Sequence, residues 1–397
     1  MTQPPAALRG HDIVCVGFAD WDTELWTNQH HLMARLSAAN RVLFIESLGL
    51  RRPQLAGRDV RRLARRLVRG LRGPRAVATR FGTVHVLSPL VIPLHSHPAV
   101  RALNARLLGA HVRRATRRLG FAAPLLWGYV PQAEVLLDAL HPSRVVYHCV
   151  DDIAAQEGID AGSFRAAEAR FAARADLVLA SAPRLAERMR TLNDHVLFAP
   201  NVADTERFAA ALDDGPVDPA LAALPAPRVV FTGAIAEKKL DLPLLRALAA
   251  RRRDWTLALV GPVGLGDPHT DVSALAAEPN VHLLGPRPYD GLPAVLRGAD
   301  AGIIPYRHSD LTASIFPMKV YEYLAAGRPV VATALPALEG VAEIRVAADA
   351  ASMETALAEL MAGDSAAERA RRSAVAAGHS WDGRLQEIAG ALEGLER

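Results

Sequence analysis

The sequence predicts an α/β protein of two domains, each a doubly wound parallel sheet with helices on both faces. Two observations lead to this fold class. Short apolar stretches alternate with helical stretches in both halves of the chain. The length of 397 residues is more than one ordinary hydrophobic core holds. A stretch rich in proline and small residues, 213–227, is the expected linker between the halves.

Apolar runs predict the strands of both sheets. In the first half they are Ile13–Gly17, Val42–Glu46, Val84–Leu87, Pro124–Trp127, Val145–Cys149 and Leu177–Ala180. In the second half they are Val229–Gly233, Thr256–Gly261, Val281–Leu284, Gly302–Pro305 and Val330–Thr333. We therefore expect an N-terminal domain over residues 1–205 and a C-terminal domain over residues 206–380. The last helix, within residues 381–397, is expected to join the N-terminal domain.

Composition narrows the class of protein. Half of the residues are hydrophobic, yet no run of eighteen apolar residues occurs, so the sequence predicts no membrane span. The first residues lack the basic and apolar regions of a signal peptide. The two cysteines, Cys15 and Cys149, lie in strand-like runs and are expected to be buried thiols in a reducing compartment. These features predict a cytoplasmic protein.

Charge is divided unevenly along the chain. Residues 1–200 hold 27 Arg and no Lys against 16 Asp plus Glu, a net charge of +11, whereas residues 201–397 hold 19 basic and 26 acidic residues, a net charge of −7. The basic half predicts an anionic partner, either a membrane surface or a phosphate-bearing acceptor. Aromatic residues make up only 5% and no recognition motif occurs, so no nucleic-acid partner is expected.

The stretch Arg58–Arg72 places apolar residues on one helical stripe with arginines around it. Such a basic amphipathic helix can lie on anionic lipid, which would make the protein peripheral on the inner face of the membrane. An arginine-rich helix that is merely solvated is the alternative.

The most informative stretch is Pro317–Val331, with the sequence PMKVYEYLAAGRPVV. Pro317 at the first helical position and Gly327 just past the end predict a short helix between two buried strands. Such a helix opens at the carboxyl end of a parallel strand, where open α/β sheets bind ligands. Lys319 and Glu322 are three residues apart and share one face, so a cation for phosphate lies beside a carboxylate for two hydroxyls. This pairing suits a nucleoside diphosphate with its ribose, and an ordinary surface ion pair is the alternative.

On these residues the stretch resembles the donor-site signature of GT-B glycosyltransferases of family 4, the glycosyl transferases group 1 type. Its sequence is most similar to that of the teichuronic-acid and cell-surface polysaccharide branch. The stretches Val229–Lys238, Thr256–Pro262 and Val281–Tyr289 resemble, in order, the first strand and glycine turn, the second strand, and the nucleobase loop of the donor domain. The resemblance is strong over residues 228–335. It implies two Rossmann-like domains facing each other across a cleft, and a metal-independent hexosyltransferase that needs no cofactor beyond its nucleoside diphosphate sugar.

The resemblance also implies which residues bind the donor. They are Gly233, Lys238, Gly261, Arg287, Tyr306, Ser314, Ile315, Phe316, Pro317, Met318, Lys319 and Glu322. In relatives the matching glutamate holds the ribose hydroxyls, the matching lysine faces the diphosphate, and the amides of residues 314–318 complete the phosphate site. The sequence departs from the family at Ser314, where an acidic residue is usual, and at Ala234, where many relatives have arginine.

The acceptor is expected to be a hydroxyl compound, either lipid-linked in cell-surface polysaccharide or glycolipid synthesis or a small natural product. Two other functions stay open at this point. A sugar-nucleotide epimerase shares the fold, and the departures at Ser314 and Ala234 are compatible with a non-catalytic nucleotide-sugar-binding partner of a glycan assembly complex.

Catalytic residues are expected where a strand of the N-terminal sheet ends. Asp151 and Asp152 close the run that begins at Arg144, so they should face the reaction site, and one can take the acceptor proton as general base. Asp151 is the favoured base, because Asp152 is better placed to cap the following helix.

The loop after the first predicted strand is dense in polar and aromatic residues. Its Asp22, Asn28 and His31 are the expected acceptor-binding residues. The pair Asp20 and Asp22 is too short a motif to predict a metal site. The alternative is that the aromatic residues are core and the histidines lie on a solvated helix start.

Overall fold

The structure is a computed structural model that describes residues 4–23, 25–48, 70, 72–91, 98–156 and 158–395. The chain forms two compact units, one of Met1–Pro200 with Arg384–Arg397 and the other of Asn201–Gly383. Residues 213–227, expected as the linker, lie inside the second unit. There the Asp218 carboxylate caps helix α8 (Pro219–Ala222) by accepting hydrogen bonds from the amides of Ala220 and Leu221.

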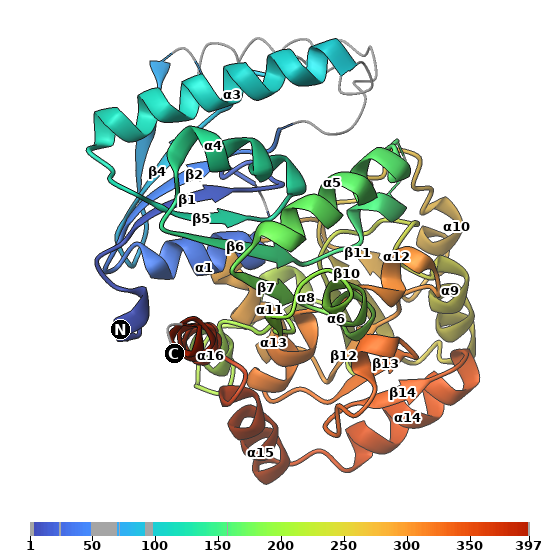
Figure 1. Cartoon of the computed structure of the whole chain (residues 1–397). Helices are drawn as coiled ribbons and strands as arrows, with labels where there is room; N and C mark the ends of the chain where they lie inside the picture. Colours follow the sequence, from blue (N-terminus) through green and yellow to red (C-terminus); the bar gives the residue numbers. More distant parts are fainter. Residues whose placement is uncertain are drawn as a thin grey trace. The chain divides into compact units, whose positions relative to one another are not determined.

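The first unit is built on an eight-stranded sheet in the order β3-β4-β2-β1-β5-β6-β7-β8 (Figure 1). Its strands are β1 Asp12–Val16, β2 Arg41–Ile45, β3 Arg75–Ala78, β4 Thr83–Leu87, β5 Leu125–Gly128, β6 Arg144–Cys149, β7 Leu177–Ala180 and β8 Val196–Phe198. All neighbours pair in parallel except β3, which pairs antiparallel with β4 at the edge. The parallel strands are apolar on both sides, as a sheet covered on both faces requires.

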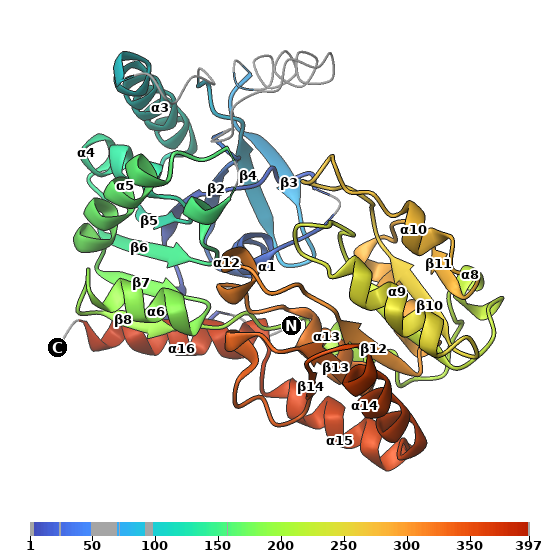
Figure 2. The same cartoon turned by 90° about the vertical axis from the view of Figure 1, so that its right-hand side faces the viewer.

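Helices cover both faces of this sheet, as right-handed connections between parallel strands require. Helices α3, α4 and α5 lie on one face and α1 on the other (Figures 1 and 2). The helices are α1 Asn28–Leu36, α3 Pro98–Leu119, α4 Leu137–Leu140, α5 Ala161–Arg174 and α6 Pro183–Arg190, with short turns η1 Ala6–Leu8, η2 Pro131–Leu136 and η3 Ile153–Ala155. Helix α16 (Trp381–Gly394) crosses the boundary between the units, and its residues from Arg384 onward belong to the first.

The second unit has a six-stranded, fully parallel sheet in the order β11-β10-β9-β12-β13-β14. Its strands are β9 Arg228–Thr232, β10 Thr256–Val260, β11 Val281–Leu283, β12 Ala301–Ile304, β13 Val330–Thr333 and β14 Arg345–Ala347. Its other helices are α7 Thr205–Ala209, α9 Leu242–Arg251, α10 Ser273–Ala276, α11 Leu292–Arg297, α12 Asp310–Ala313, α13 Lys319–Ala325, α14 Ala350–Ala362 and α15 Ala366–Ala377, with η4 Tyr289–Gly291 and η5 Pro336–Leu338. Helix α14 packs against α9, and α13 packs against α7 and α15.

Two parallel-sheet α/β units agree with the fold class predicted from the sequence. Each predicted strand is present, with ends that differ by at most one residue. Strands β3, β8 and β14 were not predicted. All three are edge strands of three or four residues, and β3 and β14 lack the continuous apolar run that marks a buried strand.

Within the described residues, no helix is both long and apolar enough to cross a membrane. The expected basic helix Arg58–Arg72 lies outside the described residues, apart from positions 70 and 72.

His148 is an unusual polar residue in the core of the first unit. It lies on β6, is completely buried, and its ring stacks on Tyr129 with a centroid distance of 4.8 Å. Among the described residues, neither ring nitrogen has a hydrogen-bond partner. Burial lowers the pKa of His148 from 6.5 to about 3, and the positive charge of Arg384 acts in the same direction. The folded unit therefore holds this ring neutral.

We predict that His148 weakens the fold in acid. The unfolded chain binds a proton at this ring below pH 6.5 and the folded chain does so only near pH 3. The ring therefore lowers the free energy of unfolding by at most about 1.4 kcal/mol per pH unit across that window. His148→Phe should flatten this part of the acid limb, measured by urea unfolding at pH 7, 6, 5 and 4 (about one unit apart). His195→Phe, at an exposed position, is the control, and equal acid limbs in His148→Phe and wild type would contradict the prediction.

Candidate active site

Helix α13 is fixed to the second sheet through one buried side chain, Tyr323. The Tyr323 hydroxyl accepts a hydrogen bond of 2.8 Å from the backbone amide of Thr232, the last residue of β9. On β12, a Cβ atom at Gly302 would lie only 2.3 Å from the Tyr323 ring, so glycine is needed there for the ring to pass. Burial raises the pKa of Tyr323, and the phenol stays protonated. The first turn of α13 is thereby held at the carboxyl ends of β9 and β12.

Lys319 begins α13 and lies over Gly233, the residue that follows β9. A Cβ atom at Gly233 would be 2.5 Å from Lys319 Cε and 2.8 Å from Nζ, so a side chain there would displace the lysine. The Lys319 ammonium is also 5.7 Å from the centroid of the Phe231 ring, within cation–π range.

Gly261 brings the next loop against the same place. A Cβ atom at Gly261 would lie 1.9 Å from the carbonyl oxygen of Gly233, closer than any side chain allows. The Gly233 amide in turn donates a 2.8 Å hydrogen bond to Val260 at the end of β10. The loops that follow β9 and β10 therefore meet backbone to backbone, as expected where a bulky ligand must approach the main chain.

Glu322 lies one turn beyond Lys319 and is only 5% exposed. No described residue donates a hydrogen bond to its carboxylate. Burial raises the pKa of Glu322, the Lys319 charge lowers it, and the nearby Asp204 raises it further. A buried carboxylate without donors is costly to maintain, which is characteristic of a site that a hydroxyl ligand completes.

The segment between α12 and α13 has a more irregular form than the sequence suggested. Helix α13 begins at Lys319 with Met318 as its N-cap, so Pro317 is not its first helical residue. Ser314, Ile315, Phe316 and Pro317 are buried and Met318 is partly exposed. The Phe316 carbonyl accepts a 3.0 Å hydrogen bond from the Asn201 side chain, and the Phe316 ring stacks on Tyr321. The end of the helix follows the prediction, with Gly327 in the left-handed region at φ 73°.

Three other predicted donor residues have structural partners. The Arg287 guanidinium donates to both Asp218 oxygens, at 2.6 and 3.2 Å, and this pairing holds the pKa of Asp218 below its usual value. The Lys238 ammonium donates to the Gly266 carbonyl. Tyr306 is buried, and its carbonyl accepts from Thr333. The partnership of Arg287 with a residue 69 positions away is invisible in the sequence.

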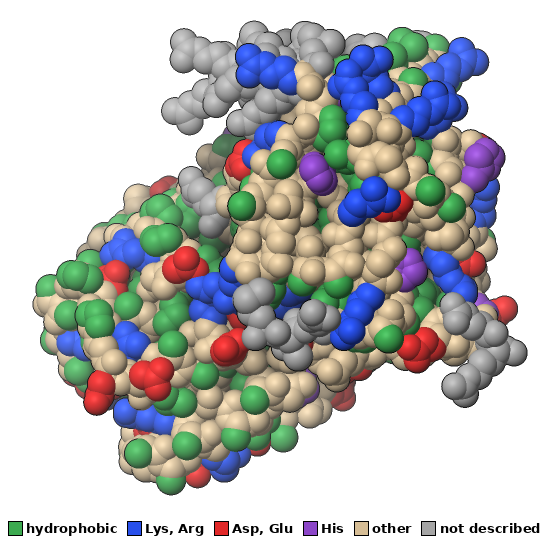
Figure 3. Space-filling model, turned by 90° about the vertical axis from the view of Figure 1, so that its left-hand side faces the viewer, with side chains coloured by type: hydrophobic (Ala, Val, Ile, Leu, Met, Phe, Trp, Pro, Cys, Tyr) green, Lys and Arg blue, Asp and Glu red, His purple; other side chains and the backbone are tan. Residues whose placement is uncertain are grey.

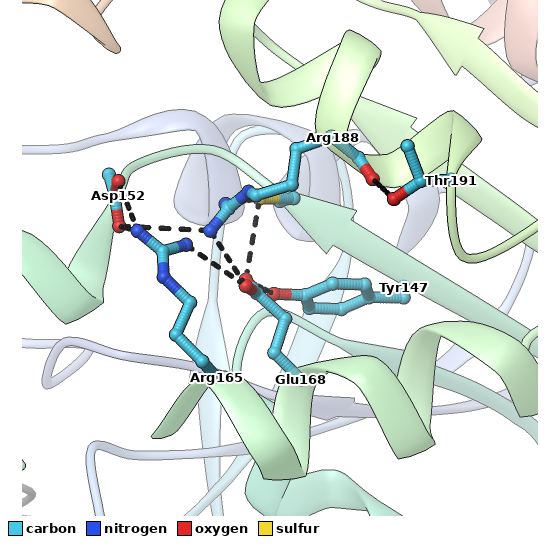
Figure 4. Close-up of polar contacts among 7 residues, drawn as sticks. Tyr147, Asp152, Arg165, Glu168, Arg188 and Thr191 are labelled. Atoms are coloured by element: carbon cyan, nitrogen blue, oxygen red, sulfur yellow. Dashed lines mark hydrogen bonds and ion pairs between the residues drawn. The ribbon is translucent and has the colours of Figure 1, made fainter. Parts of the chain in front are cut away.

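In the first unit, Asp151 and Asp152 follow β6. Asp152 occupies the N-cap position of η3 but its side chain does not cap, so the expected capping role is wrong. Instead its carboxylate pairs with Arg165 of α5 at 2.5 and 2.7 Å (Figure 4). Arg188 Nη1 lies 4.0 Å from the same carboxylate. Asp151 is partly buried beside this pair.

Arg165 and Arg188 also contact a second, more deeply buried carboxylate. Glu168 is 2% exposed, lies 2.9 Å from Arg188 and 3.3 Å from Arg165, and accepts a 2.7 Å hydrogen bond from the Tyr147 hydroxyl (Figure 4). Burial raises the pKa of Glu168, opposed by the Tyr147 hydrogen bond and by Arg165. The cluster ties β6, α5 and α6 together below the loop that carries Asp151.

The structure does not gather the predicted acceptor residues at one exposed surface. Asp22 pairs with Arg75 at 2.7 Å. Asn28 is buried and accepts a 2.8 Å hydrogen bond from the Tyr129 hydroxyl. His31 is buried with its ring edge-on to Trp26 at 5.5 Å. The alternative of histidines on a solvated helix start is wrong, because His30 and His31 both lie in the core.

A cavity of about 710 Å³ in the first unit was not predicted. It lies between α3, η2 and α5, and its lining combines apolar side chains such as Leu108 and Phe164 with Arg101, Gln132 and Arg170. Residues far apart in the sequence meet here, so no local pattern signals it. Among the described residues there is no cluster of three or more side chains suited to hold a metal ion.

Comparison with known proteins supports the sequence resemblance. Residues 226–363 match the family profile described as glycosyl transferases group 1. The Bacillus subtilis protein named "Putative teichuronic acid biosynthesis glycosyltransferase TuaH" is 40% identical over 108 residues, a stretch that makes up 27% of this chain and 26% of that protein. This chain therefore aligns with only about a quarter of that relative's length.

Solved structures resemble the whole chain. HepE of Anabaena, solved in complex with UDP and glucose, superimposes with a TM-score of 0.63 at 16% identity, covering 96% of this chain and 99% of that one. Sucrose-phosphate synthase of Thermosynechococcus elongatus gives 0.67 at 15% identity, covering 97% and 99%. These likenesses concern the fold, and they confirm the predicted GT-B architecture of two parallel-sheet domains.

The cluster around Glu168 predicts a stability effect. Arg188→Met removes the nearest cation from a buried carboxylate and should lower the free energy of unfolding by about 3 kcal/mol, measured by urea denaturation. Arg190→Met, at an exposed position of the same helix, is the matched control and should change it little. Adding Glu168→Gln to Arg188→Met should recover part of the loss, and no recovery would show that the guanidinium acts through packing alone.

Proposed function

We propose that this chain, whose residues 226–363 form a glycosyl transferases group 1 domain, transfers a hexose-like sugar from a nucleoside diphosphate sugar to a hydroxyl acceptor. The observation that carries the proposal is the buried Glu322 carboxylate, without a donor among the described residues, one turn from Lys319. A vicinal pair of ribose hydroxyls satisfies such a carboxylate, and a diphosphate satisfies the cation over Gly233. The HepE structure with UDP and glucose supports this ligand class.

The reaction needs a leaving group to be stabilised and a proton to be removed. The bond between the anomeric carbon and the diphosphate oxygen breaks, and a new bond forms from that carbon to the acceptor oxygen. Lys319, with Lys238 and the backbone of residues 314–318, would offset the charge that develops on the departing diphosphate. Asp151 would take the acceptor proton. This scheme needs no metal and no further cofactor.

The acceptor class follows from charge and from the relative. The first 200 residues carry a net charge of +11, which favours an anionic acceptor such as a lipid-linked phosphate, or an anionic membrane surface. The partial match to TuaH supports a role in cell-surface polysaccharide synthesis. We place the protein in the cytoplasm, peripheral to the inner face of the membrane. A thermal-shift panel of nucleoside diphosphates and their sugars identifies the donor, since a tenfold excess over Kd stabilises by about 1.4 kcal/mol.

Glu322→Gln should weaken binding of UDP or the nucleotide found by that panel about 5- to 150-fold, because charge-assisted hydrogen bonds to the ribose are lost. The raised pKa of Glu322 adds a pH signature. Wild-type binding should fall as pH drops through that raised pKa, and the Gln variant should lack this dependence. Calorimetry measures both, with Glu339→Gln, at an exposed position of the same unit, as control. Wild-type affinity in a correctly folded Glu322→Gln protein would exclude the assignment.

Asp151→Asn should bind donor normally and lose transfer by roughly 100-fold or more, the scale of general-base catalysis. Asp152→Asn should lose less, because Asp152 is held by Arg165. The measurement is kcat with a hydroxyl acceptor, and Asp194→Asn, at an exposed position of the same unit, is the control. Full turnover in Asp151→Asn would move the base elsewhere. Donor binding without turnover in wild type would favour the non-catalytic binding partner.

A further inference from the structure

The outer face of α3 is a strongly cationic surface. The helix contains six arginines and no acidic residue. All six arginine side chains are exposed. From residue 60 to residue 133 the sequence has no Asp or Glu at all. Arg and Lys side chains gather at the top of the face drawn in Figure 3, the level at which Figure 1 places α3.

Four of these arginines differ from others in the same unit, because they have no acidic partner among the described residues. Arg41 pairs with Asp12, Arg165 with Asp152, and Arg170 with Glu134. By contrast, none of Arg106, Arg113, Arg114 and Arg117 makes an ion pair with any residue in the described part of the chain. The positive charge of this face is therefore not offset by acidic residues in the described part of the chain, as it is at Arg41, Arg165 and Arg170.

The same face exposes apolar side chains. Leu103 is 43% and Leu107 is 39% exposed. At 100° per residue, these leucines share one stripe with Ala110, Arg114 and Arg117, opposite the buried stripe that packs on the sheet. The α3 residues that line the cavity, including Asn104 and Leu108, lie off this stripe. One side of the helix thus lines a cavity and another offers leucines flanked by arginines.

We propose that this outer face, from Leu103 to Arg117, docks onto an anionic lipid bilayer. Guanidinium groups bind lipid phosphates while leucines enter the boundary between headgroups and acyl chains, the two interactions that hold an interfacial helix. A nucleic acid would use the arginines but not the leucines, and α3 carries no Phe, Tyr or Trp on which bases could stack. The docking surface rests on the peripheral membrane location proposed above and names the residues for it. It does not depend on the proposed transfer reaction, since none of its residues belongs to the donor or catalytic groups.

The test is flotation of the full chain with vesicles of equal parts phosphatidylglycerol and phosphatidylcholine, against phosphatidylcholine alone, at low and high salt. The wild type should bind the anionic vesicles at low salt only. Arg113→Gln, Arg114→Gln and Arg117→Gln together should weaken binding on the order of 100-fold. A matched triple, Arg190→Gln, Arg253→Gln and Arg345→Gln, removes the same charge from exposed positions elsewhere and should retain most of the binding.

Leu103→Ser with Leu107→Ser should weaken binding about tenfold at constant charge. Full binding by this variant would overturn insertion and leave only attraction to a polyanion. No binding of the wild type to anionic vesicles, or equal losses in the two arginine triples, would also overturn the proposal. Nucleotide binding and turnover of a soluble acceptor should be unchanged in all these variants, so a failed docking surface is distinguishable from a failed reaction assignment.

Discussion

The hydrogen bond between the Tyr323 hydroxyl and the Thr232 amide positions helix α13, which carries Lys319 and Glu322. It joins α13 to the end of β9 at 2.8 Å, and it is possible only because β12 has glycine at position 302. With α13 in this position, Lys319 lies over Gly233 and the Glu322 side chain is buried in the second unit. A seven-residue helix has little stability of its own, so its placement depends on this packing rather than on helix propensity.

The chain contains two buried carboxylates whose surroundings argue for different roles. Glu168 has two arginines and a tyrosine hydroxyl around it, so its charge is compensated inside the fold and its role is structural. Glu322 has only the charge of Lys319 nearby to favour its ionised form, and no described residue donates to it. A fold keeps such a group only at a cost to stability, and functional sites are where proteins keep costly groups.

The sequence predicted what is encoded locally. The parallel strands are continuous apolar runs, and Gly327 ends α13 because its left-handed backbone suits glycine. The pair Lys319 and Glu322 follows from helix spacing. The predictions that failed concerned side chains whose partners lie on other elements of the fold. Asp152 forms an ion pair with Arg165, thirteen residues further along the chain, and does not cap a helix. His31 is buried because aromatic residues of the loop after β1 pack against it, and residue spacing alone does not predict this packing. The cavity is formed by three elements, α3, η2 and α5, and no one of them predicts it.

Helix α3 contributes to both the cavity and the cationic surface of the first unit, and neither was predicted. It lines the cavity of about 710 Å³ and, on another side, presents leucines among arginines, four of which pair with no acidic residue in the described part of the chain. Apolar side chains line the cavity together with Arg101 and Arg170 and the acidic Glu134 and Asp160, and Arg170 pairs with Glu134, so the cavity suits a ligand with an apolar part more than an anion. The proposed docking on anionic lipid would raise the local concentration of a lipid-linked acceptor near the protein. The proposed membrane docking uses one side of this helix and the cavity uses another, so variants of the two sides can separate docking from any ligand binding in the cavity.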